Sequence, residues 1–285
     1  MPSVDCRGHP AQNRGMRWVI VGCGYTGAYL ARALAARGDD LTLTRREVEE
    51  IEDLARPLGA RACRVDLADP ATLDGVIADG SIVVCLAPPG AEPAREITGL
   101  VHAAARAANI VYVSSTGVYG PANGAWVDEQ WPLAPVTWSG KARVAAEAAL
   151  AEANIPVAIL RAAGIHGPGR KMSDRIREGK HRVVGDGTSH VSRIHVVDLV
   201  TAIIAAGERS ATGVFNIADD DPAPIGEVAD AFAAKLGVPP SPRVPPELVS
   251  ADVAGMLTAN RKISNQRMKD ELGVVLRYRS WRDGL

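Results

Sequence analysis

From residue 17 onward, short apolar runs rich in β-branched residues alternate with longer, alanine-rich segments. Runs of the first kind are typical of buried strands, and they lie at 18–21, 41–44, 62–65, 82–86, 110–113 and 157–160. Helical segments lie at 29–37, 93–108 and 140–153, and another is expected after Asp69-Pro70, which fit the N-cap and N1 positions. Strands that are apolar on both faces and separated by helices predict an α/β fold, a Rossmann-like doubly wound parallel sheet.

After residue 161 the alternation becomes less regular. We expect helices at 173–180, after 196 and at 225–236, one more strand at 214–217, and a stiff proline-rich connector at 238–246. This half is interpreted as a small C-terminal substrate lobe. The expected division is a disordered extension at 1–15, a Rossmann domain at 16–165 with 191–217, and the substrate lobe at 166–190 with 218–285.

The composition is that of an ordinary globular chain of 285 residues, with 47% hydrophobic residues and a formal net charge of −1. It has no basic excess and no long apolar run, so neither nucleic acid nor a membrane is an expected partner. Residues 1–15 lack the apolar core of a signal peptide. The four cysteines, Cys6, Cys23, Cys63 and Cys85, form no C-x-x-C pair. We therefore expect no metal site, no disulfide, reduced buried thiols and a cytoplasmic location.

The segment Gly22-Cys-Gly-Tyr-Thr-Gly27 stands between the first predicted strand and the first predicted helix, the context in which a G-x-G-x-x-G motif is informative. Gly22 permits a tight turn, Gly24 lets the backbone approach a pyrophosphate, and Gly27 lets the helix pack closely on the strand. The helix N-terminus favours negative charge. We therefore expect a dinucleotide here rather than a strand–helix turn without a ligand.

The residues after the second predicted strand bear on which dinucleotide is bound. An NAD-specific protein needs a carboxylate there for the ribose 2′-hydroxyl, whereas this chain has Arg45 and Arg46. Arginine can bind the 2′-phosphate of NADP in a bidentate manner, although arginines at a strand end also often just face solvent. NADP is therefore expected rather than NAD, with Asp66 and Leu67 after the third strand meeting the adenine.

Three later segments resemble motifs of the extended short-chain dehydrogenases, the NAD(P)-dependent epimerase/dehydratase family. They are Val113-Ser-Ser-Thr-Gly-Val-Tyr-Gly120, Leu160-Arg-Ala-Ala-Gly-Ile-His-Gly-Pro-Gly169 and Ser192-Arg-Ile-His-Val-Val-Asp-Leu199. With the glycine loop they occur in the family's order and cover nearly all of residues 16–285. The resemblance implies an NAD(P)-dependent oxidoreductase or epimerase/dehydratase-like protein that acts on a small metabolite.

The resemblance also implies that Ser115 holds a substrate carbonyl or alcohol, and that a tyrosine and a lysine follow one turn apart at the start of the next helix. Two registers compete for these positions. One pairs Thr137 with Lys141, and the other pairs Ser139 with Arg143. Neither register contains a tyrosine.

We favour Ser139 with Arg143, because Gly140 then matches the family's Tyr-Gly and Glu147 falls one turn after the basic residue. Proton exchange by the family's tyrosine contributes about 10² to 10⁴ in rate, and serine is a far weaker acid than a phenol. Arginine is effectively never deprotonated, but Arg143 can bind the nicotinamide ribose or a substrate anion. The alternative function is thus an NADP(H)-binding sensor or scaffold with weak or no catalysis.

The resemblance implies further cofactor contacts and an assembly. The residues expected to line the cofactor are Tyr25, Thr26, Leu86, Ala87, Arg143, Ala162 and Ile165. Relatives commonly pair through the helices after the fourth and fifth strands, so a homodimer is expected.

Two histidines and three tryptophans complete the candidates. His166 replaces the tyrosine of the family's Y-G-P motif, where an imidazole that titrates near neutral pH could exchange protons, although simple pocket lining is the alternative role. His195 is expected to be structural. Trp126, Trp131 and Trp138 precede the atypical site and could wall an aromatic substrate pocket, but core positions are expected in a chain with two phenylalanines.

Overall fold

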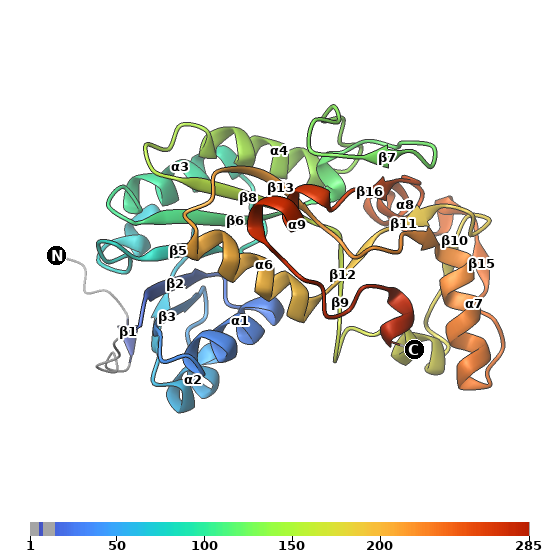
Figure 1. Ribbon diagram of the computed structural model, residues 1–285, viewed down its shortest axis with the longest axis horizontal. Helices are drawn as coiled ribbons and strands as arrows, with labels where there is room; N and C mark the ends of the chain where they lie inside the picture. Colours follow the sequence, from blue (N-terminus) through green and yellow to red (C-terminus); the bar gives the residue numbers. More distant parts are fainter. Residues whose placement is uncertain (1–5, 8–14, 285) are drawn as a thin grey trace. The chain divides into compact units, whose positions relative to one another are not determined.

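An eight-stranded sheet dominates the computed structural model, which describes residues 6–7 and 15–284 (Figure 1). Its order is β1-β4-β3-β2-β5-β6-β8-β13. The strands are β1 Cys6–Arg7, β2 Arg17–Val21, β3 Asp40–Arg45, β4 Arg61–Arg64, β5 Ile82–Cys85, β6 Asn109–Ser115, β8 Val157–Ala162 and β13 Gly213–Ile217. Strands β2 to β6 pair in parallel, and the order reverses at β2, next to which β3 and β5 lie on either side. The predicted Rossmann-like, doubly wound fold is confirmed.

Helices cover both faces of this sheet (Figure 1). Figure 1 shows α3 and α4 on one face and α1, α2 and α6 on the other. Their bounds are α1 Tyr25–Ala35, α2 Glu49–Ala55, α3 Pro93–Ala103, α4 Trp138–Leu150 and α6 Val196–Glu208. On the α3 and α4 face, Val19, Val21, Leu100 and Ala146 belong to one buried cluster. The alternation of apolar strands and alanine-rich helices therefore produces the layered core that it predicts.

Two helical predictions need correction. The segment opened by Asp69 forms only a 3₁₀ helix, Pro70–Leu73, although Asp69 Oδ1 accepts a hydrogen bond from the Ala71 N–H as an N-cap should. The helix expected at 29–37 begins earlier, at Tyr25, because the glycine loop leads directly into it.

The N-terminal segment contradicts two expectations. Cys6 and Cys63 form a disulfide, so these two thiols are not reduced. Cys6 and Arg7 form strand β1, antiparallel to β4, whereas the rest of the predicted extension, except Gly15, lies outside the described residues. The cysteines are 57 residues apart in sequence and become opposite neighbours only through this strand pairing, which no local spacing reveals. The cytoplasmic location thus loses part of its basis and stays a prediction.

The remaining two cysteines agree with the expectation. Cys23 and Cys85 are free and buried. Burial raises the pKa of the Cys23 thiol to about 11 and that of the Cys85 thiol to about 12. Both are therefore uncharged at neutral pH.

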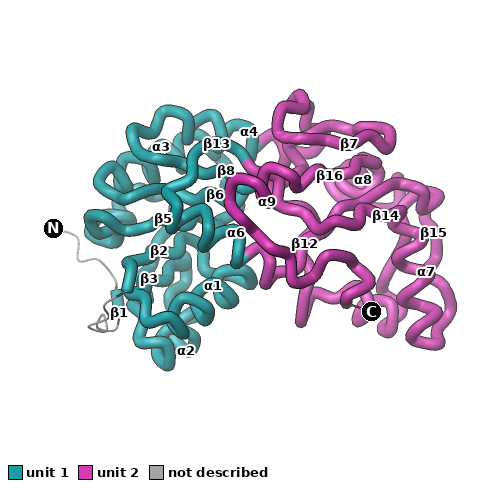
Figure 2. The backbone as a smooth tube through the Cα atoms, in the orientation of Figure 1, with its two compact units in different colours: residues 1–114, 142–160, 200–214 teal, residues 115–141, 161–199, 215–285 magenta. Residues whose placement is uncertain are grey.

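The chain divides into two compact units (Figure 2). Unit 1 comprises residues 1–114, 142–160 and 200–214, and unit 2 comprises residues 115–141, 161–199 and 215–285. The division expected from the sequence has other bounds and stays a prediction. None of the helices in the described ranges has the length and apolar character that crossing a membrane requires.

Unit 2 consists largely of short strand pairs and helices. The strands are β7 Trp126–Val127, β9 Gly164–His166, β10 Val183–Val184, β11 His190–Val191, β12 Arg193–His195, β14 Ala223–Pro224, β15 Arg243–Val244 and β16 Lys262–Ile263. The helices are α5 Met172–Arg177, α7 Ile225–Leu236, α8 Ala251–Leu257 and α9 Gln266–Leu272. The proline-rich connector is attached at Arg243–Val244, because β15 pairs there with β10.

Candidate active site

The glycine loop joins β2 to α1 in unit 1. Gly22 has a φ of +83°, and a Cβ placed on it would lie 2.6 Å from the Ala87 backbone nitrogen. Only glycine therefore lets this turn pass so close to the segment that follows β5. Leu86, in that segment, donates its N–H to the Val21 carbonyl oxygen at 2.8 Å. The predicted cofactor residues Leu86 and Ala87 thus lie beside the predicted glycine loop.

Gly24 fits a bound pyrophosphate. A Cβ on Gly24 would meet no heavy atom within 4 Å, so its backbone borders open space rather than protein. Helix α1 begins at the next residue, Tyr25, without a side-chain cap and without an acidic residue in its first turn, which includes Thr26 and Gly27. The positive end of the helix dipole is therefore left uncompensated, as anion-binding helices require.

The two arginines after β3 differ in their surroundings. Arg45 Nη2 forms an ion pair with Glu50 Oε2 at 2.6 Å. Arg46 is exposed and forms no ion pair or hydrogen bond with the described part of the chain. Arg45 is thus paired with a carboxylate, whereas Arg46 has no carboxylate partner among the described residues.

Asp66 and Leu67 follow β4, as expected. Asp66 Oδ1 accepts a hydrogen bond from the Ala68 N–H at 3.1 Å, and its own N–H donates to Thr72 Oγ1 at 2.9 Å. Leu67 is buried. This turn holds the Asp66 carboxylate at the carboxyl end of β4, the edge of the sheet at which such folds bind nucleotides.

The start of α4 bears on which residues occupy the positions of the missing dyad. Thr137 is buried, and its Oγ1 accepts a hydrogen bond from the Gly140 N–H at 3.0 Å, which makes Thr137 the N-cap of α4. Lys141 is exposed. The Thr137 hydroxyl is therefore engaged in capping α4. This favours the register of Ser139 with Arg143 over that of Thr137 with Lys141.

Two hydrogen bonds fix α4 against the end of β6. Arg143 Nη1 donates to the Val113 carbonyl oxygen at 2.9 Å. One turn further, Glu147 Oε1 accepts from the Ser114 hydroxyl at 2.5 Å, and both side chains of this pair are buried. This geometry supports the register of Ser139 with Arg143 and gives Ser114 and Glu147 a structural role.

The turn that follows β6 contains Ser115. Ser115 Oγ accepts a hydrogen bond from the Gly117 N–H at 3.0 Å. A Cβ on Gly140 would collide with the Gly117 carbonyl oxygen, so the first turn of α4 lies directly against this turn. Ser139, beside Gly140, is exposed. Within unit 2, the structure thus brings together the segments that carry the two predicted serines.

His166 does not titrate near neutrality, contrary to the sequence-based expectation. It pairs with His195 across β9 and β12, and the two rings meet edge to face with centroids 5.2 Å apart. Burial, followed by the neighbouring His195 and the Arg193 guanidinium, lowers the pKa of His166 to about 4. The imidazole is therefore neutral at pH 7 and a poor proton donor there.

His195 has the contacts of a structural residue. Its Nδ1 accepts a hydrogen bond from the Val197 N–H at 3.2 Å, in the first turn of α6. Its ring stacks on Tyr278 with centroids 3.6 Å apart. Of the other two predicted residues in unit 2, Ala162 ends β8 and is buried, and Ile165 is half-buried in β9.

Sequence reasoning missed a buried polar cluster in unit 2. The Tyr119 hydroxyl donates to Asn216 Oδ1 at 2.8 Å and accepts from Arg161 Nη1 at 2.9 Å. Arg161 and Asn216 follow or lie within apolar strand runs, where a buried polar residue is the informative signal. This cluster joins the segment after Ser115 to β8 and β13.

The expectation of core positions for the tryptophans is wrong for two of them. Trp126 is 55% exposed and Trp138 is 58% exposed, whereas Trp131 is half-buried. Trp138 stands in the first turn of α4, where Gly140 and Ala142 occupy the buried positions. The indole is thus left on the outside of the helix.

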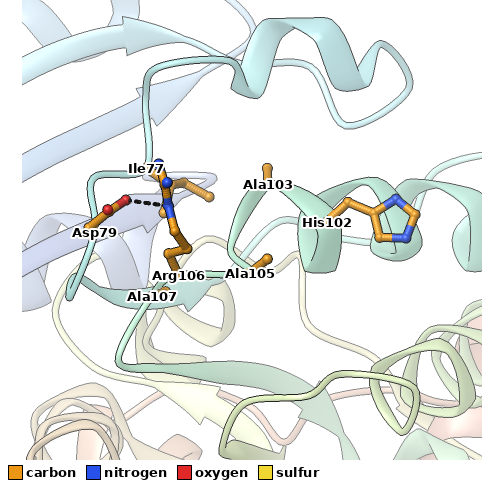
Figure 3. Close-up of a pocket in the computed structure, with 7 residues that line it drawn as sticks. All are labelled: Ile77, Asp79, His102, Ala103, Ala105, Arg106 and Ala107. Atoms are coloured by element: carbon orange, nitrogen blue, oxygen red, sulfur yellow. Dashed lines mark ion pairs between the residues drawn. The ribbon is translucent and has the colours of Figure 1, made fainter.

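A cavity of about 340 Å³ in unit 1 is not a candidate active site (Figure 3). It is lined by Ile77, Asp79, His102, Ala103, Ala105, Arg106 and Ala107. These residues precede β5 and β6, at the amino ends of the strands, whereas nucleotides bind at the carboxyl ends. Arg106 and Asp79 form an exposed ion pair across it, 2.9 Å from nitrogen to oxygen.

Comparison with known sequences gives matches over most of the chain. A family model described as NAD(P)H-binding matches residues 22–206. The 3-diazoavenalumate denitrifying reductase of Streptomyces sp is 32% identical over 95% of this chain and 99% of that protein. Protein YeeZ of Escherichia coli strain K12 is 33% identical over 70% of this chain and 76% of its own length. The 2-alkyl-3-oxoalkanoate reductase of Stenotrophomonas maltophilia is 28% identical over 78% of this chain and 76% of that protein.

Solved structures show the same fold. A conserved protein of unknown function from Silicibacter pomeroyi has 33% identity and a TM-score of 0.81, covering 94% of this chain and 96% of that one. A human epimerase family protein solved with NADPH has 22% identity and a TM-score of 0.76, covering 92% and 95%. UDP-glucuronic acid 4-epimerase from Bacillus cereus, solved with NAD, has 18% identity and a TM-score of 0.74, covering 92% and 94%.

Proposed function

Because the chain belongs to the NAD(P)H-binding family of extended short-chain dehydrogenases, whose members are oxidoreductases and epimerase/dehydratase-like proteins, we propose that it is an NADPH-dependent reductase of small carbonyl compounds. The observation that carries the proposal is the contact of the Ser115 turn with the first turn of α4. The contact brings the turn with Ser115 next to the helix turn with Ser139, and the family resemblance assigns substrate binding to these positions.

The reaction class is inferred from the relatives. Two of them are named reductases, and the name of one specifies a substrate with a ketone, a carboxylate and an alkyl group. We infer a substrate of the same class, a keto acid with an alkyl or aryl body, rather than a sugar nucleotide. The Arg143 guanidinium agrees with an anionic substrate.

Ser115 is the residue that we assign to the substrate. Its oxygen accepts from Gly117, and its hydroxyl hydrogen has no acceptor among the described residues, so it is available to a substrate carbonyl oxygen. When bound, NADPH supplies the hydride that reduces such a carbonyl. As the carbonyl is reduced, negative charge develops on its oxygen, and the Ser115 hydroxyl stabilises that charge by donating a hydrogen bond.

The proton for that oxygen comes from solvent in this proposal. Ser139 lacks the acidity of the family's phenol, and His166 is neutral at pH 7 with a pKa of about 4. Arg143, already bonded to the Val113 carbonyl, supplies positive charge without exchanging a proton. The enzyme is therefore expected to be slow on generic carbonyl substrates.

The preference for NADP is part of the proposal. An NADP-specific fold needs cations where the ribose 2′-phosphate lies, and Arg46 is an exposed guanidinium without a competing partner in the described residues. We propose that Arg46 makes the principal contact with the 2′-phosphate. Arg45 makes a second contact when its ion pair with Glu50 is broken.

The cytoplasmic location and the homodimer are likewise proposals. The dimer would form through α3 and α4, as the resemblance implies. Light scattering of the purified chain tests it, because a monomer mass at micromolar concentration would contradict it.

Turnover tests the reductase. NADPH consumption is measured with 2-alkyl-3-oxoalkanoates and with UDP-glucuronic acid, for the wild type, Ser115→Ala and the control Ser210→Ala. We expect oxidation with the keto acids alone and a loss of about 10² in kcat/KM for Ser115→Ala, without change in NADP affinity. Tight NADPH binding without turnover on any carbonyl compound would instead favour the sensor or scaffold.

A further inference from the structure

The Cys6–Cys63 disulfide has no part in the proposed reaction, yet it lies close to the residues expected to select the cofactor. Cys6 is half-buried and Cys63 is fully buried, and together they join β1 to β4. Cys63 stands opposite Thr44 of β3, the residue that precedes Arg45. The sulfurs are therefore one strand away from the end of β3, where the contacts with the NADP 2′-phosphate are expected. All of these residues belong to unit 1.

A guanidinium contacts both sulfur atoms of this disulfide. Arg61 Nη2 lies 3.8 Å from Cys6 Sγ and 3.8 Å from Cys63 Sγ. A cation beside a disulfide promotes exchange, because it attracts an incoming thiolate and stabilises the thiolate that leaves. Cys6 is the less buried of the two residues, so an incoming thiolate reaches Cys6 and releases Cys63. This edge of the sheet thus carries the groups that thiol–disulfide exchange needs.

Strand β1 also brings a cation to helix α2. Arg7 Nη2 forms an ion pair with Glu49 Oε1 at 3.0 Å, and Arg7 Nη1 forms another with Glu52. Glu49 is the first residue of α2 and is three residues after Arg46. Because Arg7 directly follows Cys6, the disulfide holds this cation beside two carboxylates that are close to the proposed 2′-phosphate contact.

The described part of β1 is short. It has two residues, which pair with two residues of β4. A strand of this length is marginal by itself, and exposed ion pairs contribute little to its stability. Opening of the disulfide therefore frees Arg7 from α2. The charges of Glu49 and Glu52 are then uncompensated and repel the 2′-phosphate.

We propose that the Cys6–Cys63 disulfide is an exchange site for a small thiol of the glutathione class, and that its opening weakens NADP binding. In the first step the thiolate forms a bond to the Cys6 sulfur and the bond to Cys63 breaks, so that Cys63 leaves as a thiolate and takes up a proton. A second thiolate then attacks the small-molecule sulfur and releases Cys6, which also takes up a proton. The protein disulfide is thereby reduced by two electrons, and two small thiols are oxidised to one disulfide.

The first test measures the exchange, which needs no cofactor. The oxidised chain is incubated with reduced glutathione, and alkylated thiols are identified by mass spectrometry. We expect a glutathione adduct on Cys6 followed by two new thiols, at a rate that falls about tenfold in Arg61→Met and is largely kept in Arg61→Lys. The free, buried thiols of Cys23 and Cys85 should stay unmodified.

The second test measures cofactor affinity and rests on the proposed NADP preference. Calorimetry compares NADP and NAD binding by the oxidised and the reduced wild type, and thermal unfolding confirms that both forms are folded. We expect reduction to weaken NADP binding about threefold and to leave NAD binding nearly unchanged, because only NADP carries the 2′-phosphate. High salt should remove the difference, since these charges are exposed.

Variants of Arg7 separate the charge from the disulfide bond. Oxidised Arg7→Ala should bind NADP as the reduced wild type does, and reduction should have no further effect on it. Arg7→Lys should respond to reduction like the wild type. The matched control is Arg177→Ala, which breaks the exposed ion pair with Asp174 on α5 and should bind NADP like the wild type in both states.

Several outcomes overturn the proposal. They are no reaction of the disulfide with glutathione, equal exchange rates in the wild type and Arg61→Met, or binding of NADP by Cys6→Ser with Cys63→Ser as tight as that of the oxidised wild type. An NADP preference of the same size in both redox states also overturns it and leaves the proposed cofactor preference standing. If the oxidised protein binds NADP and NAD equally, the cofactor preference fails, while the exchange site stands on the first test.

Discussion

Arg143 donates a hydrogen bond from Nη1 to the Val113 carbonyl oxygen at 2.9 Å, so a guanidinium lies at the carboxyl end of β6. The Glu147 carboxylate, one turn further along α4, accepts from Ser114. These two contacts align α4 with β6 independently of any tyrosine. The register that pairs Ser139 with Arg143 agrees with these contacts and stays a prediction.

Restoring the dyad should raise turnover. We expect Ser139→Tyr with Arg143→Lys to increase kcat for keto acids at least tenfold, because a phenol beside an ammonium exchanges protons far better than a serine, with a contribution of about 10² to 10⁴. Steady-state kinetics measure the gain. Thr137→Tyr, which retains Lys141, is the control. A gain in that variant alone would show that the other register is the functional one.

Cofactor preference should depend on charge after β3. Arg46→Ala should weaken NADP about tenfold and leave NAD unchanged, since a charge-assisted contact contributes about 1.5 to 3 kcal/mol. Glu50→Gln should strengthen NADP a few-fold, because it frees Arg45 from its ion pair. Calorimetry measures both. Glu271→Gln, which breaks a comparable ion pair with Arg267 on α9, should change neither affinity. Equal NADP affinity in all these variants would remove the basis for NADP preference.

Acid should destabilise the protein through His166. Its pKa is about 4 in the folded chain and about 6.5 when unfolded, so the unfolded state binds more protons between these values. The free energy of unfolding should therefore fall by about 1 to 3 kcal/mol as the pH decreases from 6.5 to 4. Urea unfolding of His166→Gln should show a smaller loss than the wild type, whereas the exposed His102→Gln should not. If His166→Gln and His102→Gln lose the same free energy of unfolding between pH 6.5 and 4, the lowered pKa of His166 is contradicted.

Reduction should destabilise unit 1. The Cys6–Cys63 bond closes a long loop, and removal of such a bond typically costs about 2 to 4 kcal/mol. We expect dithiothreitol to lower the melting temperature of the wild type but not that of Cys6→Ser with Cys63→Ser. A wild-type melting temperature that does not respond to the reductant would show that the two thiols are unpaired in solution.

Sequence patterns predicted unit 1 better than unit 2, for a physical reason. Strands such as β2 are buried on both faces, so their apolar runs are visible locally, and Gly22 is recognisable because the turn that follows them needs it. The strands of unit 2 are two or three residues long and exist because distant partners pair with them, as β15 does with β10. Helices α8 and α9 were not predicted, because seven residues give little periodicity.

The residue types at the candidate site were predictable from the sequence, but the burial and the neighbours of each side chain were not. The motif predicted roles for Ser115 and Arg143 that stay predictions, and the structure adds the contacts of α4 around them. Sequence could not show that burial and two neighbours keep His166 neutral. Nor could it show that Trp138 is exposed, because that depends on where α8 attaches.

The collision that any side chain at residue 140 would make with the Gly117 carbonyl has an evolutionary consequence. The Gly117 oxygen belongs to the main chain, so a change of side chain in the Ser115 turn does not relieve this collision. The segment before α4 belongs to the same contact, because a Cβ on Gly140 would also lie 2.8 Å from Pro135 Cβ and 3.0 Å from Thr137 Oγ1. We therefore expect position 140 to accept only glycine, whereas the side chains of the Ser115 turn can be exchanged one at a time.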